Sequence, residues 1–315
     1  MKQFLSVKDT SDPADLVRLA RDLKRDPFQF ENLGKRKTIG LIFLNPSLRT
    51  RMSMIKAAQL VGLNVIALNL NQEGWKIETE DGVIMDGDNA EHINEAIPVI
   101  SSYCDLLAIR SFPTLTDREY DYSEALLIKI QRLSSVPVIN MESATVHPLQ
   151  SLTDLVTIDE LKKVERPKIV LSWAPHPRSL PQAVANSFLE WTLSHGHDIT
   201  VVQPKGLELA KEFTGNAAVS YNQKEALSEA DFVYVKNWSS YNEYGSIHRD
   251  PEWIISREKM RVTNEAKLMH CLPVRRNVVI SEEILESPQS VVVLQAGNRV
   301  CAAQAVLVSL LKENG

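Results

Sequence analysis

The sequence predicts an α/β protein with two domains, each built around a doubly wound parallel sheet. Apolar, strand-like runs alternate with helical segments along the 315 residues, and this alternation starts again near residue 168. Some runs are continuously apolar, as in 39–44, which is typical of parallel strands buried on both faces. A chain of this length also commonly forms two domains.

The predicted elements follow from where these runs begin and end. Asp12 and Pro13 are typical of a helix start, and the apolar residues from Leu16 to Leu23 form the buried stripe of that helix. The expected strands of the first domain are 37–44, 64–68, 105–110 and 136–140, with helices over 90–101 and 122–133. The second domain is expected to contain strands 168–173, 198–202, 231–235, 267–271 and 290–294, with helices over 149–161 and 182–194, and a last helix over 299–312 ends the chain.

The composition excludes several classes of protein. There are 35 Lys and Arg against 40 Asp and Glu, a net charge of −5, so a general nucleic-acid surface is not expected. No apolar run approaches the length of a membrane span, and the N-terminus lacks the basic and apolar regions of a signal peptide. We therefore expect a cytoplasmic protein with no membrane partner and with reduced thiols at Cys104, Cys271 and Cys301.

Familiar cofactor motifs do not occur in the sequence. The twelve glycines contain no G-x-G-x-x-G, and Asp88 stands where the P-loop spacing of Gly82 and Gly87 would need a lysine. His195-Gly196-His197 has the form of a metal clip, but a helix-ending turn with Gly at its C-cap explains it better. An anionic substrate would therefore need a local basic pocket of its own.

The cradle, residues 45–53, places the hydroxyls of Ser47 and Thr50 and the guanidiniums of Arg49 and Arg51 where a strand turns into a helix. The first N–H groups of such a helix have no internal partners and carry the positive end of its dipole. They can therefore hold a phosphate together with Ser47 and Arg49. The alternative is that Ser47 only caps the helix and that the arginines are solvated.

Other polar residues follow the predicted strands of both domains. In open parallel sheets, ligands gather beyond the carboxyl ends of the strands. The residues at such positions are Arg110, His147, Gln150, Lys236 and Cys271. Taken alone, each could be a turn residue, a surface charge or a small buried side chain. Their occurrence together with the cradle indicates a site.

Three motifs in this order resemble the transcarbamylases: Ser47-Leu48-Arg49-Thr50-Arg51, His147-Pro148-Leu149-Gln150 and His270-Cys271-Leu272-Pro273. The resemblance covers essentially the whole chain, including Asn298-Arg299 at the start of the last helix. Ordinary ornithine carbamoyltransferases carry Asp-x-Trp-x-Ser-Met-Gly where this chain has Lys236-Asn237-Trp238-Ser239-Ser240. With Trp75, the proline-rich loop and Val274-Arg275-Arg276-Asn277, this departure resembles the N-acylornithine carbamoyltransferases of arginine biosynthesis.

The resemblance implies a role for each residue of a carbamoyl phosphate site. Arg49, Arg110 and His147 would be catalytic. Arg110 and His147 would polarise the carbonyl oxygen, where negative charge develops in the tetrahedral transition state. The residues expected to bind carbamoyl phosphate are Ser47, Leu48, Arg49, Thr50, Trp75, Arg110, His147, Gln150, Cys271, Leu272 and Arg299. Cys271 and Leu272 would act through their backbone carbonyls, which orient the carbamoyl amide together with Gln150.

The resemblance also implies an acceptor whose α-nitrogen is acylated. The expected acceptor-binding residues are Glu142, His176, Lys236, Arg275 and Ala90, with Trp75 close to the same pocket; Glu142 could contribute only its backbone. Lys236 would pair with the α-carboxylate of an N-acyl-L-ornithine. The leaving phosphate would take the proton of the attacking δ-amine, so no metal or organic cofactor is expected. The remaining alternatives are another amine as the acceptor and a non-catalytic phosphate-binding homologue.

Two positions bear on which acyl group is bound. Acetyl-preferring relatives carry a Glu aligned with Ala90 and a Lys near Val279, and this chain has neither. A Glu beside the acyl group would repel a succinyl carboxylate, so its absence favours N-succinylornithine over N-acetylornithine. Ala90 could equally be an ordinary helix-starting residue, and Glu91 lies one position away.

The family further implies an aspartate/ornithine carbamoyltransferase type of fold. We expect a carbamoyl phosphate domain over 1–146, an acceptor domain over 147–298 and a final helix, 299–315, that packs back on the first domain. The family also implies a homotrimer with interface active sites, in which the loop 75–88 reaches a neighbouring subunit. In this branch the C-terminal domain is a trefoil knot. The chain after Lys236 would then thread the loop at 175–181.

Overall fold

The computed structural model describes residues 1–314 and divides the chain into two compact units. The first unit comprises residues 1–113, 120–149 and the segment from 299 onward, and the second comprises 114–119 and 150–298. The main passage of the chain into the second unit comes after residue 149, and the chain returns to the first unit at Arg299.

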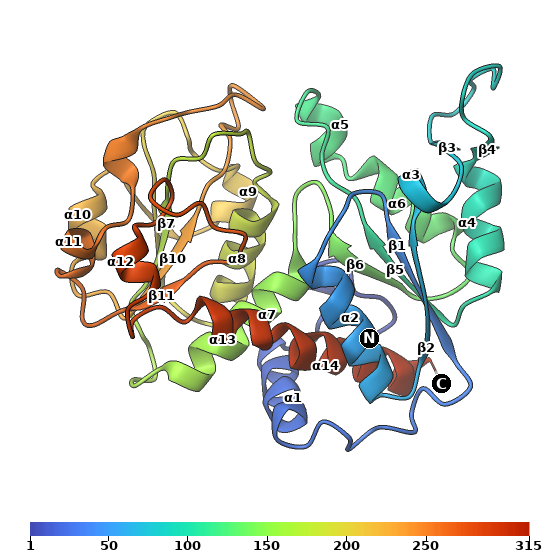
Figure 1. Ribbon diagram of the computed structural model, residues 1–315, viewed down its shortest axis with the longest axis horizontal. Coiled ribbons are helices and arrows are strands. Elements are labelled where there is room, and N and C mark those ends of the chain that lie inside the picture. The colour runs from blue at the N-terminus through green and yellow to red at the C-terminus, as the bar shows by residue number, and fades with distance from the viewer. Residues whose placement is uncertain (315) are drawn as a thin grey trace. The chain divides into compact units, whose positions relative to one another are not determined.

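The first unit is built on a four-stranded parallel sheet with the order β2-β1-β5-β6 (Figure 1). The strands β1, β5 and β6 are buried almost throughout, which explains why their sequences are largely apolar rather than alternating. The strands are β1 (Thr38–Phe43), β2 (Asn64–Asn69), β5 (Leu106–Arg110) and β6 (Val138–Glu142), and β3 (Ile77–Glu78) pairs separately with β4 (Glu91–His92). The helices are α1 (Pro13–Arg25), α2 (Arg49–Leu60), α3 (Leu70–Glu73), α4 (Ile93–Ser102), α6 (Ala125–Leu133) and α14 (Arg299–Glu313), while α5 spans Arg118–Tyr122.

The last helix, α14, belongs to the core of the first unit. It packs against α1 and α2, and nearly all of its residues from Cys301 to Leu311 are buried (Figure 1). By length and composition alone, the helical stretch 292–313 could cross a membrane, but 67% of its most apolar window is buried inside the protein. No apolar run of this length was expected from the sequence. Asn298 and Arg299 divide the apolar residues of this stretch into two shorter runs.

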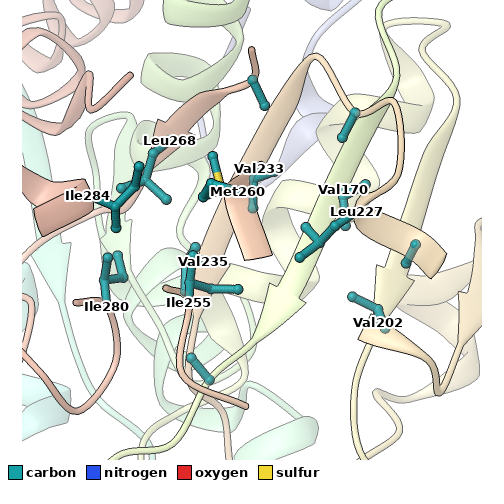
Figure 2. Packing of buried hydrophobic residues seen from close by; sticks show 14 of the residues in the cluster. Val170, Val202, Leu227, Val233, Val235, Ile255, Met260, Leu268, Ile280 and Ile284 are labelled. Carbon is teal, nitrogen blue, oxygen red and sulfur yellow. The ribbon is translucent and has the colours of Figure 1, made fainter. Parts of the chain in front are cut away.

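The second unit contains a five-stranded parallel sheet with the order β11-β10-β7-β8-β9. Its strands are β7 (Ile169–Trp173), β8 (Ile199–Val202), β9 (Ala218–Ser220), β10 (Phe232–Lys236) and β11 (Lys267–Met269). Its helices are α7 (Pro148–Leu161), α8 (Ala183–Ser194), α9 (Lys211–Thr214), α10 (Gln223–Leu227), α11 (Arg257–Met260), α12 (Glu282–Leu285) and α13 (Val292–Gly297). Figure 2 shows Val233 and Val235 of β10 in one buried cluster with Leu227, Met260 and Ile284. Burial of each such side chain stabilises the fold by about 1.5–3 kcal/mol.

The strand predicted over 290–294 is wrong. Only Ser290 forms a bridge with the sheet, opposite Leu268, and the chain then turns into α13. A short apolar run does not distinguish a strand from a helix by its periodicity. In α13, Val292 is buried and Val293 is 79% exposed. The packing of this helix therefore buries only some of the apolar residues of the run.

Two predicted helices also have different bounds. Residues 90–92 are not helical, because Ala90 donates its N–H to Lys76 at 3.0 Å and the next two residues pair with β3. His92 caps the helix that follows, since its Nδ1 accepts the N–H of Asn94 at 3.2 Å. The helix expected over 122–133 is divided into α5 and α6 at Glu124, whose φ is +50°. Its carboxylate accepts bonds from Ser143 and Thr145 at 2.6–2.7 Å.

Two loops of the second unit are joined by hydrogen bonds. The N–H of Ser239 donates to the Leu180 carbonyl at 3.0 Å, and Asn237 donates its side-chain amide to Ala174 at 2.7 Å. The chain after β10 therefore runs along the proline-bearing loop that follows β7. At the end of α8, Gly196 has a φ of +83°, which confirms the helix-ending turn predicted there.

Candidate functional site

The cradle follows the carboxyl end of β1 and includes the first residues of α2. The Oγ of Ser47 accepts the N–H of Thr50 at 3.3 Å, so the hydroxyl closes the first helical turn. Leu48 precedes the helix with a 70% exposed side chain. The backbone N–H groups of this first turn have no partner within the helix, which makes it suited to an anion.

The two arginines next to Thr50 differ in their surroundings. Arg51 is turned to β2, where it donates to the Ala67 carbonyl at 3.2 Å and lies 3.6 Å from the Glu73 carboxylate. The contacts of Arg51 therefore direct it toward β2 rather than toward an anion in the cradle. Arg49 occupies the first position of α2 and is the arginine predicted to bind the phosphate.

Arg299 joins the cradle from the far end of the sequence. It opens α14, and its Nη2 donates to the Oγ1 of Thr50 at 2.8 Å. Both side chains are buried, with Arg299 6% and Thr50 3% exposed. The packing of α14 against α2 thus places a buried guanidinium beside the predicted phosphate position.

The carbonyl corner, formed by Arg110, Glu142 and His147, lies at the ends of β5 and β6. The Glu142 carboxylate accepts from Arg110 Nε at 3.2 Å and from its Nη2 at 3.0 Å, and it lies 3.6 Å from His147 Nε2. All three side chains are at most 10% exposed. An arginine at this depth needs a carboxylate partner, since an unpaired buried charge is costly.

Arg110 also connects this corner to the cradle. Its Nη1 donates to the carbonyls of Asn45 and Pro46 at 2.9 and 2.7 Å, and its guanidinium stacks 4.0 Å over Phe112. Among residues 1–314, the contacts of Arg110 leave one of its five guanidinium N–H groups for a ligand. The cradle and the carbonyl corner therefore form one rigid site within the first unit.

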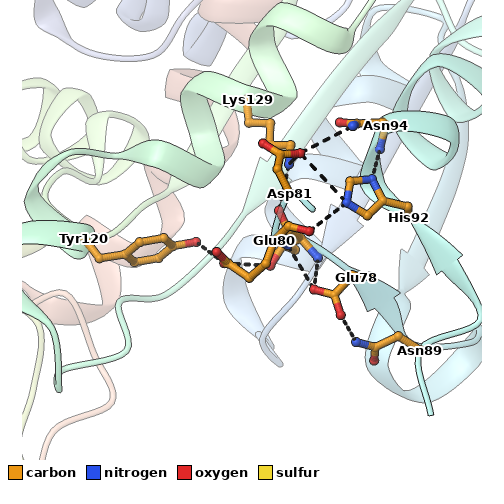
Figure 3. A network of polar contacts seen from close by, with 9 residues as sticks. Glu78, Glu80, Asp81, Asn89, His92, Asn94, Tyr120 and Lys129 are labelled. Atoms are coloured by element: carbon orange, nitrogen blue, oxygen red, sulfur yellow. Dashed lines mark hydrogen bonds and ion pairs between the residues drawn. The ribbon is translucent and has the colours of Figure 1, made fainter. Parts of the chain in front are cut away.

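The arm, residues 74–92, carries Trp75 and Ala90 and has a different character. Trp75 is 62% exposed and donates its Nε1 to Glu91 at 2.7 Å within the arm. Figure 3 shows the polar network that fixes the arm, in which Lys129 of α6 binds Asp81 at 2.6 Å and the Thr79 carbonyl at 2.8 Å. The hydrogen bond from Lys129 holds the pKa of the Asp81 carboxyl below its ordinary range.

The remaining carbamoyl phosphate residues lie in the second unit. Gln150 is in the first turns of α7 and is 1% exposed. Cys271 and Leu272 follow β11, and the N–H of Leu272 donates to His270 Nδ1 at 2.8 Å. Gln150 is buried in α7, whereas Cys271 and Leu272 are partly exposed and directly follow β11, the kind of position where ligands gather in parallel sheets.

The residues of the second unit that are predicted to bind the acceptor are basic. Lys236 ends β10, is 8% exposed, and donates to the Asn237 carbonyl at 3.0 Å. His176 lines a cavity of about 390 Å³ together with Pro175, Pro177, Arg249 and Val278. Burial lowers the pKa of His176, the hydrogen bond with Arg178 opposes this, and the charges of Lys236 and Arg275 lower it further. His176 therefore lies in the positive electrostatic field of Lys236 and Arg275.

Glu142 is expected to contact the acceptor, and this contact stays a prediction. Its carboxylate is held by Arg110 and its carbonyl accepts the N–H of Ser111 at 2.8 Å, a pairing with Arg110 that the sequence analysis did not predict. The signal was present in the sequence, because Arg110 and Glu142 end neighbouring strands and face each other in the register of β5 and β6. The pairing could be recognised only once the strand order was known.

Comparisons with known proteins agree with this geometry. Residues 2–160 match the family model "Aspartate/ornithine carbamoyltransferase, carbamoyl-P binding domain", and 181–310 match the "Asp/Orn binding domain" model. The chain is 50% identical to an N-succinylornithine carbamoyltransferase of Bacteroides thetaiotaomicron over 315 residues, 99% of both chains. It is 33% identical to an N-acetylornithine carbamoyltransferase of Xanthomonas axonopodis pv. citri, with 100% of this chain and 98% of that one covered.

A solved structure is similar along nearly the whole chain. It is a glutamate-to-alanine mutant of N-acetyl-L-ornithine transcarbamylase complexed with carbamyl phosphate and N-succinyl-L-norvaline. The TM-score is 0.90 at 34% identity, with 98% of this chain and 100% of the other covered. With both of its domains matched by family models, this chain belongs to the aspartate/ornithine carbamoyltransferase family, in the branch that acts on N-acylornithines.

Proposed function

We propose that this protein transfers the carbamoyl group of carbamoyl phosphate to the δ-amine of N-succinyl-L-ornithine. The products are N-succinyl-L-citrulline and phosphate, in arginine biosynthesis. The observation that carries this proposal is the 50% identity to an N-succinylornithine carbamoyltransferase over 99% of both chains, against 33% for the N-acetylornithine enzyme.

The cradle binds the phosphate of the donor substrate. Ser47, Leu48 and Thr50 supply hydroxyl and backbone N–H donors, and Arg49 and Arg299 supply charge-assisted hydrogen bonds. The Thr50 to Arg299 bond at 2.8 Å supports this, since it already places both groups at the start of α2. Dense donors on one side of the ligand fix its orientation.

The carbonyl corner stabilises the transition state. The δ-amine nitrogen attacks the carbamoyl carbon, a C–N bond forms, and the carbonyl oxygen gains negative charge before the C–O bond to phosphate breaks. Arg110 and His147 donate to that oxygen where the charge develops. Within the part of the chain that the structure describes, the contacts of Arg110 leave one N–H for this role, and Glu142 fixes the direction of the guanidinium. Trp75 covers the ligand from the arm.

The amine must lose a proton to react. An alkylammonium has a pKa near 10.4, so deprotonation near pH 7.5 costs about 4 kcal/mol. The departing phosphate accepts this proton, and the fixed orientation of the two substrates supplies much of the remaining acceleration. Gln150 and the carbonyls of Cys271 and Leu272 hold the carbamoyl amide during the step.

The acceptor lies against the basic residues of the second unit. Lys236, His176 and Arg275 pair with its α-carboxylate, and the backbone of Glu142 contacts its acylated nitrogen. Ala90 leaves room beside the acyl group and brings no negative charge. The solved glutamate-to-alanine mutant, which is complexed with N-succinyl-L-norvaline, supports this role for a small side chain. Val279 is buried and apolar in the second unit.

The protein assembles as a cytoplasmic homotrimer whose arms complete neighbouring sites. Large apolar side chains support this: Leu48 and Met52 at the start of α2 are 70% and 64% exposed, and Ile84 on the arm is 84% exposed. Large apolar side chains that are this exposed are candidates for burial in an interface between subunits. Light scattering after gel filtration measures the oligomeric state.

The second unit also forms a trefoil knot. The bonds that join Asn237 and Ser239 to the loop after β7 support a threaded path, because they hold the two segments against each other.

An acceptor panel tests the function. Purified protein is given carbamoyl phosphate with N-succinyl-, N-acetyl- or free L-ornithine, and the ureido product is measured. We expect a kcat/KM at least tenfold higher for N-succinyl-L-ornithine than for N-acetyl-L-ornithine. A preference for the acetyl compound would establish the alternative acceptor. Binding of carbamoyl phosphate without turnover of any amine would establish a non-catalytic homologue.

A further inference from the structure

A buried carboxylate lies one helical turn after Gln150. Asp154 of α7 is 0% exposed, and its Oδ1 accepts hydrogen bonds from Gln150 Nε2 and from Gln295 Nε2, both at 2.7 Å. Gln150 and Gln295 are 1% and 0% exposed. Asp154 thus joins α7 to α13, two helices that are far apart in the sequence.

The carboxylate decides which end of the Gln150 amide faces the ligand. A carboxylate only accepts hydrogen bonds, so the NH2 end of Gln150 turns to Asp154 and its Oε1 turns the other way. The carbamoyl NH2 of the substrate is a donor and needs acceptors. With the amide reversed, Gln150 would present a second donor to it, which repels rather than binds.

Gln295 carries the same constraint to the strand end. Because its Nε2 is on Asp154, its Oε1 accepts the N–H of His270 at 2.9 Å, and His270 Nδ1 accepts the N–H of Leu272 at 2.8 Å. In the trans peptide between residues 271 and 272, the N–H and the carbonyl point in opposite directions. Fixing the N–H of Leu272 therefore aims the Cys271 carbonyl away from the His270 ring.

We propose that Asp154 is a positioning residue for the carbamoyl amide. Its carboxylate orients the Oε1 of Gln150 directly and the Cys271 carbonyl through Gln295 and His270. Both are then acceptors fixed before the substrate binds, which avoids reorganising them at the moment of reaction. This inference rests on the proposed function, because only that function makes the carbamoyl amide of carbamoyl phosphate the ligand of these two acceptors.

Two ligands separate a positioning role from a structural one. Inorganic phosphate needs only the cradle, whereas carbamoyl phosphate also needs acceptors for its amide. In Asp154→Ala, we expect carbamoyl phosphate affinity to fall about 10- to 100-fold by calorimetry, as for one or two lost hydrogen bonds. Affinity for inorganic phosphate should stay within about twofold of wild type. Asp154→Asn keeps one acceptor oxygen, so its loss should be smaller.

Two control variants test whether the effect belongs to the carboxylate of Asp154. Val156→Ala makes a cavity in the same helix without touching a polar group, and it should leave both affinities unchanged. In a Gln150→Ala background, Asp154→Ala should cost less than it does alone, because both act on one amide. If Asp154→Ala does not fold, Asp154→Asn and Gln295→Met give the same comparison.

Equal losses for both ligands, or no loss for carbamoyl phosphate, would overturn the positioning role. Wild-type protein that binds inorganic phosphate but neither binds nor uses carbamoyl phosphate would overturn the proposed function as well.

Discussion

The cradle and the arm of the first unit are built in opposite ways. The cradle is linked through buried charged groups, Arg110 and Arg299, which come from distant parts of the chain. The arm is mostly exposed, and surface polar contacts such as Lys129 to Asp81 hold it. The residues proposed to bind carbamoyl phosphate in the first unit thus lie mostly in a buried, hydrogen-bonded core. The residue proposed to choose the acyl group lies on an exposed segment, where substitutions are tolerated with little loss of stability.

The largest effect is expected in the cradle. Arg49→Ala should abolish measurable carbamoyl phosphate binding, a loss of about 10³-fold, because a charge-assisted contact to the phosphate disappears. Calorimetry with carbamoyl phosphate measures this. Arg51→Ala is a matched control, since Arg51 binds Ala67 and Glu73 instead. Equal losses in the two variants would show that the comparison between the arginines is wrong.

Glu142→Gln tests the carbonyl corner. The variant leaves the buried guanidinium of Arg110 without its counter-charge, so we expect kcat to fall about 10²-fold and the acceptor KM to change little. Steady-state kinetics with both substrates varied separates the two parameters. Glu95→Gln on α4, with an exposed carboxylate, should have no effect. A rise in the acceptor KM at constant kcat would instead support a direct contact between the Glu142 side chain and the acceptor.

Ala90→Glu tests specificity on the arm. A carboxylate beside the acyl group should repel succinate and lower the ratio of N-succinyl to N-acetyl kcat/KM about tenfold or more. Carbamoyl phosphate affinity should not change, because the cradle is untouched. Ala90→Gln has a similar size without the charge and should shift the ratio less. An unchanged ratio in Ala90→Glu would remove Ala90 from the acceptor pocket.

The smallest effect is expected at the base of the arm. Lys129→Met removes the contacts to Asp81 and Thr79, so hydrogen exchange should speed up over residues 79–90. The free energy of unfolding should change little, because exposed ion pairs contribute little to stability. Slower exchange, or a large loss of stability, would contradict a surface-held arm.

The same contact has a pH dependence with a defined sign. The folded pKa of Asp81 lies below the unfolded value, so its contribution is complete at neutral pH. That contribution is lost as pH falls below about 4 through the folded pKa. Once exchange rates are corrected for their intrinsic pH dependence, the protection of the arm amides in wild type should therefore fall in acid, and in Lys129→Met it should depend less on pH.

The sequence alone determined the class of fold and the main motifs. Continuous apolar runs correspond to β1, β5 and β7, because burial on both faces of a parallel sheet requires apolar side chains at every position. Charged or polar residues at strand ends, such as Arg110 and Lys236, were recognisable for the same reason. They interrupt an otherwise buried run.

Only the tertiary structure decided which of these groups meet. Residues 292–294 became helical although their local propensity favours a strand, and Ala90 joined a two-stranded ladder at the base of the arm. The pairs Arg110 with Glu142 and Asp154 with Gln295 depend on strand order and on helix packing. The two residues of the first pair are 32 positions apart in the sequence, and those of the second pair are 141 positions apart. Contacts at such separations produce no hydrophobic periodicity in the sequence, because they depend on how the whole fold packs.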